Sequence, residues 1–161
     1  MAYKAVVSAS ARAKIKELLE EVAAKKGNFS LAMLAQTLPE VRDRWTLVVS
    51  APWADSLGSR SIISDLSSRL SSKLDRIALS AIDRISVRPT DDPVVQIIVQ
   101  HFGDLGKDVS VEESGYHLRN ASVWSGAGAH WDFGEGFVFI ADPNVNGPSS
   151  RPAKKMREVV R

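Results

Sequence analysis

The chain has 161 residues, of which 44% are hydrophobic and 25% are charged, and this composition is typical of a globular protein with one substantial core. No apolar run approaches the roughly 18 to 20 residues that a membrane-spanning helix needs, and the first residues lack the pattern of a secretory signal. The absence of cysteine excludes disulfides, thiolate nucleophiles and cysteine-ligated metal sites. We therefore expect a soluble, cytoplasmic protein that does not bind a membrane.

The formal net charge of +2 is distributed unevenly along the chain. Residues 1–30 carry a net charge of +3, residues 31–147 carry −5 and residues 148–161 carry +4. A dedicated nucleic-acid binder places its basic surface on the folded domain, so this pattern argues against nucleic acid as the main partner. The sequence predicts a single α/β domain over residues 1–147 and a basic, flexible tail over residues 148–161.

Two helices are predicted near the start of the chain. In residues 10–26 the apolar residues recur at helical spacing, and Gly27 suits the end of the helix. Ser30 can cap a second helix over residues 31–38, which Pro39 would end. Two successive helices suggest a helix-turn-helix. The second helix, however, has few basic or amide side chains that could hydrogen-bond to the edges of DNA bases, so we do not expect DNA recognition here.

The hydrophobic pattern then changes. Residues 44–53 contain a continuous apolar run, which is typical of a strand covered on both faces. Residues 55–82 carry apolar side chains at helical steps, and residues 83–89 resemble a second strand. A strand, a helix and a strand in this order predict a βαβ unit with parallel strands.

The second half of the chain completes the predicted sheet. Residues 90–103 are rich in β-branched residues, but an aspartate at 91 or 92 followed by Pro93 is a typical helix start, so we predict a helix. Three further strands are predicted at residues 108–113, 117–124 and 137–142. The sequence therefore predicts an α/β fold with two N-terminal helices, followed by a mixed sheet that contains one βαβ unit and a C-terminal antiparallel meander.

The segment "SGAGAHWDFGEGF", residues 125–137, is the most glycine-rich part of the chain. A dinucleotide-binding loop would lead from a strand into a helix, whereas this segment leads into a predicted strand, and no lysine stands at the P-loop position. We therefore interpret the glycines as a connection between two antiparallel strands. This connection is longer than a tight hairpin turn, and long loops are more often functional than short ones. A functional role for the segment is therefore kept as an alternative interpretation.

Metal binding is the second interpretation of this region. His130 and Asp132 lie in the segment, and His117 and Asp142 lie on the flanking strands. Two imidazoles and two carboxylates are suitable ligands for zinc or manganese, but no spacing fixes two of them on one element. We predict no metal site, and the sequence identifies no cofactor.

A ligand site is predicted instead at the carboxyl ends of the two parallel strands, where α/β sheets collect ligands. The helix that follows residue 58 would add free backbone N–H groups, which favour a phosphate. The predicted ligand-binding residues are Trp53, Ser59, Arg60, Ser61, Arg88 and Asp91. No histidine, serine and acid are spaced as a catalytic triad, so catalytic residues are not assigned and enzymatic activity stays open.

The predicted long helix has an unusual polar side, because it carries serines where a solvated helix usually carries glutamate and lysine. These serines lie at positions 61, 64, 67, 68, 71 and 72. A small, weakly charged face suits a subunit contact, and the four tryptophans offer further surface that needs covering. The sequence therefore favours a non-catalytic or regulatory interaction module that forms a homodimer or binds a protein partner. The alternatives are a small enzyme or binding protein for a phosphorylated molecule, and a nucleic-acid-associated protein that acts through its basic tail.

Overall fold

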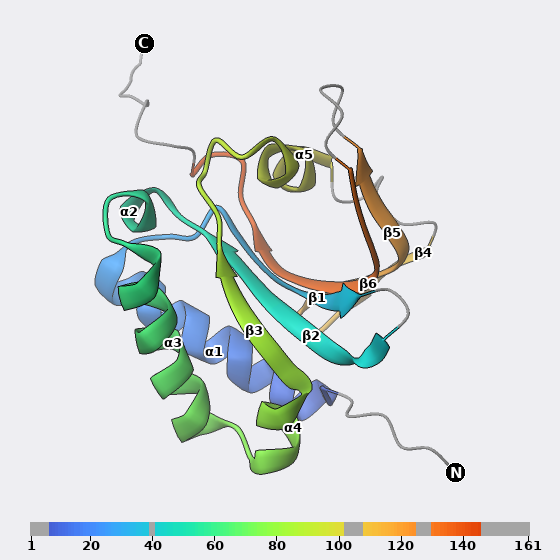
Figure 1. Cartoon of the computed structure of the whole chain (residues 1–161), viewed down its shortest axis with the longest axis horizontal. Coiled ribbons are helices and arrows are strands. Elements are labelled where there is room, and N and C mark those ends of the chain that lie inside the picture. The colour runs from blue at the N-terminus through green and yellow to red at the C-terminus, as the bar shows by residue number, and fades with distance from the viewer. Residues whose placement is uncertain (1–6, 39–40, 102–107, 125–129, 146–161) are drawn as a thin grey trace.

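The computed structural model describes residues 7–38, 41–101, 108–124 and 130–145. Within these residues the chain forms a mixed six-stranded sheet with helices on both faces, so the α/β class is confirmed (Figure 1). The strands are β1 (Leu31–Leu38), β2 (Val41–Ser50), β3 (Ile82–Val87), β4 (Asp108–Glu112), β5 (Gly115–Trp124) and β6 (His130–Ala141). The helices are α1 (Ala9–Lys26), α2 (Pro52–Asp55), α3 (Ser59–Lys73), α4 (Arg76–Ala81) and α5 (Pro93–His101).

The strand order in the sheet is β3-β2-β1-β6-β5-β4. β2 and β3 are parallel and are joined by α2, α3 and α4, as expected for a βαβ crossover. All other neighbouring strands are antiparallel, including the successive strands β4, β5 and β6. The sheet thus brings β1, from the start of the chain, against β6, from its end.

The predicted second helix over residues 31–38 is wrong, because these residues form β1. β1 lies between β2 and β6 and pairs with both. The side chains of Ala32 and Leu34 pack on one face of the sheet, and those of Leu31, Met33 and Ala35 pack on the other. Pairing on two sides and burial on two faces outweigh the helix preference of alanine, leucine and methionine. Residues 31–38 therefore do not form the second helix of a helix-turn-helix, an interpretation that the sequence already disfavoured.

The single helix predicted over residues 55–82 is divided into shorter helices. α3 ends at Lys73, and Asp75 starts α4 because its side chain accepts a hydrogen bond from the Ala78 backbone N at 2.8 Å. The chain then enters β3 directly at Ile82. The predicted apolar face is nevertheless observed, since Ile62, Leu66 and Leu70 of α3 are buried.

The sheet carries a separate apolar cluster on each face. On one face α1 and α3 cover the sheet, and Ile15, Leu18 and Leu66 are among the side chains that fill the space (Figure 1). On the other face α5 packs with Val95 and Ile98 against β1, β5 and β6. Every helix in the part of the chain that the structure describes is too short or too polar to span a lipid bilayer.

Most of the glycine-rich segment belongs to a strand and not to a loop. β6 begins at His130, so the described part of the segment pairs with β5, and residues 125–129 lie outside the described residues. The β5–β6 register shifts near Ala121, opposite Gly134, whose φ is +69°. A positive φ at a register shift is typical of a β-bulge. This segment leads from strand to strand, so it lacks the strand-to-helix context that a dinucleotide-binding loop requires.

Candidate functional site

A cluster of polar side chains lies at the carboxyl ends of β2 and β3. It includes residues from the loops that follow these two strands. Thr90 is buried and donates two hydrogen bonds to Asp55, one from its backbone N at 3.2 Å and one from its hydroxyl at 2.5 Å. The side chain of Gln96 donates to the carbonyl oxygen of Thr90 at 2.5 Å. These bonds hold the segment before α5 against the end of α2.

Arg88 and Asp92 form a charged pair at this edge. Arg88 Nη1 lies 3.0 Å from Asp92 Oδ2, and the guanidinium carbon lies 5.3 Å from the centre of the Trp131 ring. The second oxygen of Asp92 accepts a hydrogen bond from the Val94 backbone N at 2.8 Å. The helix start predicted at position 91 or 92 is thus confirmed, with Asp92 as the capping residue.

Two buried polar atoms at the same edge have no hydrogen-bond partner within the described part of the chain: Ser50 Oγ and Arg88 Nε. They belong to neighbouring strand ends, because the Arg88 backbone N donates to the Val49 carbonyl oxygen at 2.9 Å. An unpartnered buried polar atom costs about 1–3 kcal/mol, so a water or ligand oxygen that reached both atoms would stabilise this edge. Phosphate binding here stays a prediction, and Arg88 is the residue that supports it best.

The other predicted ligand residues belong to α2 and α3. Ser59, Arg60 and Ser61 form the exposed first turn of α3, which begins after Gly58 without a side-chain cap. Among the described residues, no hydrogen bond or ion pair joins Arg88 to this turn. None joins Arg88 to the exposed Asp91 either. The structure therefore brings Arg88 next to Asp92, the neighbour of the predicted Asp91. It brings Ser61 of α3 to the same hollow as Trp53, apart from Arg88.

Trp53 is one of the residues that line a small hollow between α1, α2 and α3. Its ring meets that of Phe29 edge-on, with 5.4 Å between the ring centres, and its Nε1 atom is buried without a hydrogen-bond partner in the described structure. The hollow has a volume of about 20 Å³, which is enough for one water molecule. It is lined by Val22, Lys26, Trp53, Leu57, Ser61, Ile62, Asp65 and Leu66. Trp53 therefore packs mainly against the fold, beside a hollow with room for about one water molecule.

We expect the two neighbouring aspartates before α5 to differ in their contribution to stability. Asp92→Ala removes the cap of α5 and the Arg88 ion pair, so it should lower the free energy of unfolding by about 1–2 kcal/mol. Asp91→Ala is the matched control, and it should change this free energy by less than about 0.5 kcal/mol because Asp91 is exposed. Urea denaturation of both variants measures the difference, and equal losses would contradict the assignment of the cap.

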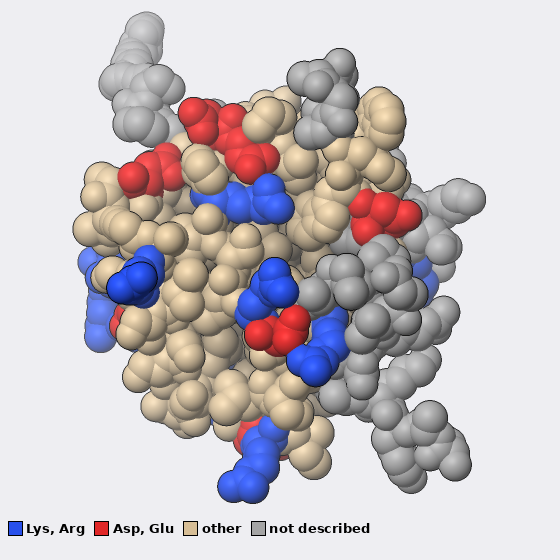
Figure 2. All heavy atoms as spheres, viewed as in Figure 1, with Lys and Arg blue, Asp and Glu red and all other residues tan. Residues whose placement is uncertain are grey.

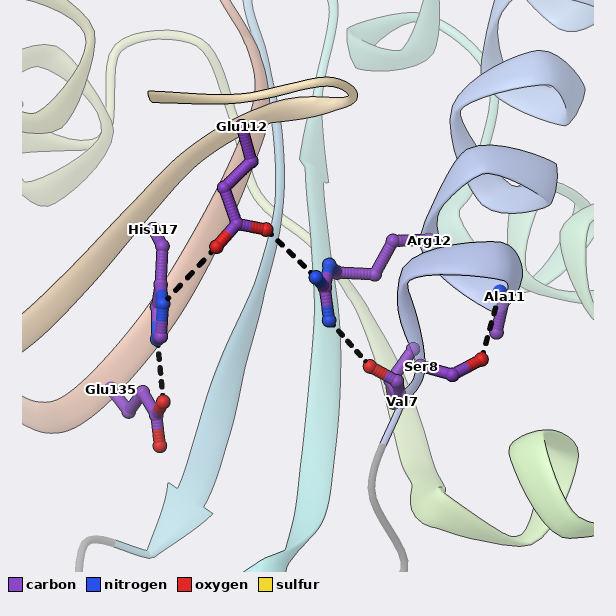
Figure 3. A network of polar contacts seen from close by, with 7 residues as sticks. All are labelled: Val7, Ser8, Ala11, Arg12, Glu112, His117 and Glu135. Carbon is purple, nitrogen blue, oxygen red and sulfur yellow. Dashed lines mark hydrogen bonds and ion pairs between the residues drawn. The ribbon is translucent and has the colours of Figure 1, made fainter. Parts of the chain in front are cut away.

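A second polar network lies where α1 meets the other end of the sheet (Figure 3). Arg12 of α1 donates to Glu112 Oε1 of β4 at 2.7 Å and to the carbonyl oxygen of Val7 at 2.6 Å. Its guanidinium carbon lies 3.9 Å from the centre of the Phe137 ring, and its side chain is only 12% exposed. The contact between Arg12 and Glu112 joins residues 100 positions apart in the chain.

His117 of β5 extends this network to β6. Its Nδ1 atom lies 3.6 Å from Glu112 Oε2, its Nε2 atom lies 2.5 Å from Glu135 Oε2, and its ring stacks on Phe137 with 4.2 Å between the ring centres (Figure 3). A neutral imidazole has one N–H group and can donate to one of these carboxylates, whereas an imidazolium can donate to both. The partners of His117 in the described structure are two carboxylates and an aromatic ring, so His117 joins β4 to β6, and Glu112 links it to Arg12 of α1. No hydroxyl nucleophile is among these partners.

The four residues considered as metal ligands are not gathered around one point. His117 lies between two glutamates, His130 packs against the exposed Trp124 ring at 4.8 Å, and Asp142 caps the turn that follows β6. No group of three or more His, Asp or Glu side chains within residues 7–145, apart from the stretches not described, is arranged to hold a metal ion. The sequence suggested His117 only as a candidate metal ligand. No local pattern in the sequence identified Arg12, Glu112 or Glu135 as members of a polar network.

A third feature is the outer face of α3, which carries the serine-rich side predicted from the sequence. All six serines are exposed, at positions 61, 64, 67, 68, 71 and 72. Leu57 before the helix is 41% exposed, and Ile77 in α4 beyond the helix is 70% exposed. Figure 2 shows that the surface over α3 is largely free of charged side chains, which gather around its margins.

Comparison with known protein families, with curated proteins and with solved structures finds no match for this chain. The geometry of these three features is therefore the basis for assigning a function.

Proposed function

We propose that the protein is a non-catalytic or regulatory interaction module that self-associates as a homodimer through the outer face of α3. The observation that carries this proposal is the exposed side of α3, which carries six serines and only one exposed charged side chain, that of Arg60 in its first turn. The exposed side chains of Leu57 and Ile77 lie beyond the two ends of this helix. The cores of protein interfaces are depleted in charged residues. Small side chains let the backbones of two helices approach closely. A two-fold axis would place the same face of a second copy against it.

Three of the charged side chains around this face have partners on their own chain. Asp65 and Arg69 pair with each other at 3.1 Å. Lys73 turns toward α1, where it lies 2.8 Å from Glu17 and 3.1 Å from Glu21. The hydrogen bond from Lys73 lowers the pKa of Glu17, and the hydrogen bonds to Glu17 and Glu21 raise the pKa of Lys73. A second copy can therefore approach the serines without burying an unpaired charge from these residues.

The tryptophans contribute less to the proposal than the sequence suggested. Trp45 is 4% exposed and belongs to the core, and Trp53 and Trp131 are half-buried. Trp124 is 67% exposed but lies at the end of β5, on a different element from α3. The support for self-association therefore comes from α3 and its flanking apolar residues.

Light scattering tests the proposal directly. We expect a mass of twice the chain mass of 17.5 kDa at high protein concentration. The triple variant Ser64→Glu, Ser68→Glu and Ser71→Glu should weaken association at least about tenfold, because each copy would bring three like charges to the interface. Circular dichroism checks that the variant stays folded.

A matched control adds the same charge elsewhere on the molecule. Ala9→Glu, Ser10→Glu and Ala13→Glu place three acids on the exposed side of α1 near its start, so this variant should keep the mass of the wild type. A monomer mass for the wild type at every concentration would refute self-association. Equal weakening in both triple variants would refute α3 as the interface.

A further inference from the structure

The side chains of Ser50 and Arg88 are neighbours on one face of the sheet. Val49 of β2 pairs with Val87 of β3, and the Arg88 backbone N donates to the Val49 carbonyl oxygen at 2.9 Å. Val49 and Val87 pack on the face that α1 and α3 cover. Because side chains alternate along a strand, those of Ser50 and Arg88, one residue further on, lie on the opposite face, which α5 covers (Figure 1).

Both side chains carry a buried polar atom that is not hydrogen-bonded to any described residue. Ser50 is 0% exposed, and its Oγ atom makes no hydrogen bond within that part of the chain. Arg88 binds Asp92 through Nη1, but its Nε atom has no acceptor there. The serine hydroxyl and the Nε–H group can each donate one hydrogen bond. Two neighbouring donors are therefore available to an oxygen-bearing ligand.

The geometry of the arginine indicates which kind of ligand fits. The Nε–H group and one N–H of Nη2 lie parallel on the same edge of a guanidinium, and this edge matches the two oxygens of a carboxylate. Asp92 uses Nη1, which lies outside that edge. Asp92 itself is held in place, because its other oxygen accepts a hydrogen bond from the Val94 backbone N at 2.8 Å. The contact with Asp92 therefore leaves the carboxylate-binding edge of Arg88 unused.

The surrounding charges favour a ligand group with a single negative charge. Asp55, Asp91 and Asp92 lie in the segments that follow β2 and β3, and Arg88 is the cation to which Asp92 is bound. A phosphate dianion would bring two negative charges to this acidic environment, whereas a carboxylate brings one. The repulsion is therefore smaller for a carboxylate.

From these observations we propose that Ser50 and Arg88 bind the carboxylate group of a small molecule, which accepts hydrogen bonds from the Ser50 hydroxyl and from Arg88 Nε. The ligand enters past Arg88, whose side chain is 34% exposed and has a flexible stem that can turn, whereas Ser50 lies deeper. The proposal is independent of self-association through α3, because α3 packs on the other face of the sheet.

Nuclear magnetic resonance tests the proposal with sodium acetate as the probe. The Arg88 Nε–H signal is followed during the titration, and Arg88→Lys identifies this signal, because lysine keeps the charge but has no Nε–H group. We expect acetate to shift the signal and to reach saturation. Sodium chloride and inorganic phosphate, added at the same pH and ionic strength, should bind at least about tenfold more weakly.

Two variants of the site are compared with two matched controls. Ser50→Ala and Arg88→Lys should each bind acetate at least about tenfold more weakly than the wild type, with the backbone amide of the adjacent Thr90 as the reporter. Ser64→Ala and Arg60→Lys make the same changes on the exposed side of α3 and should keep the affinity of the wild type.

The stability of unliganded Ser50→Ala is a further check. This variant should be at least as stable as the wild type in urea, because the hydroxyl that it removes has no partner among the described residues. An Arg88 Nε–H signal that does not move with acetate, equal binding of acetate and chloride, or unchanged acetate affinity in Ser50→Ala and Arg88→Lys would overturn the proposal.

Discussion

Replacing Gly115 by alanine should lower the free energy of unfolding by about 3 kcal/mol or more. Gly115 is the first residue of β5, it has a φ of +151°, and it lies opposite Glu112 in the β4–β5 hairpin. A Cβ atom at this position would lie 2.1 Å from the Val138 carbonyl oxygen, which belongs to the neighbouring strand β6. The backbone of β5 or β6 would have to move, and the pairing between these strands would be lost locally.

Gly58→Ala is the matched control, because nothing lies within 4 Å of the position that its Cβ would occupy. This variant should change the free energy of unfolding by less than about 0.5 kcal/mol. Urea denaturation followed by circular dichroism measures both variants. Similar midpoints for Gly115→Ala and the wild type would mean that β5 and β6 are not as close as described.

Arg12→Met should lower the free energy of unfolding by about 2–3 kcal/mol. Methionine retains most of the apolar volume against Phe137 but loses the ion pair with Glu112 and the hydrogen bond to the Val7 carbonyl oxygen. Glu112 would then face His117 without the guanidinium that balances its charge. The same urea titration measures the loss.

Arg69→Met is the control for removing an ion pair from an exposed site. Its pair with Asp65 joins side chains that are 24% and 39% exposed, so the variant should lose less than about 0.5 kcal/mol. Combining Arg12→Met with Glu112→Gln should show a coupling of about 1 kcal/mol or more between the two residues. Losses that simply add would show that Arg12 acts through packing and not through Glu112.

Elements with a clear local pattern could be predicted from the sequence. The spacing of apolar residues identified α1, and the aspartate before Pro93 identified α5. β2 was recognisable because an uninterrupted apolar run without helical spacing is typical of a buried strand. In these cases the local preference and the tertiary environment favour the same conformation.

β1 shows where this reasoning failed. The sequence of residues 31–38, LAMLAQTL, is rich in helix-forming residues, and nothing local to it indicates a strand. Its conformation depends on β6, which is distant in the chain and completes its pairing on the second side. A preference of a few tenths of a kcal/mol per residue is small compared with this pairing and the burial of both faces.

The polar network could not be predicted for a related reason. Arg12 and Glu112 are each ordinary in their own segments, and only the sheet order brings α1 and β4 together. The location of the polar cluster near Arg88 was easier to predict, because the carboxyl ends of parallel strands lie side by side wherever a βαβ unit forms. Sequence reasoning thus located a place in the fold more readily than the individual contacts within it.

The central position of β1 has a consequence for the chain during its synthesis. β1 can pair with β2 as soon as both have left the ribosome, but the strand that completes it, β6, is made much later. At roughly 5 to 20 residues per second, one side of β1 stays without its partner for several seconds. During this interval the nascent chain displays an apolar, unpaired strand whose residues favour a helix, and a molecular chaperone that shields it would protect the chain from aggregation until β6 arrives.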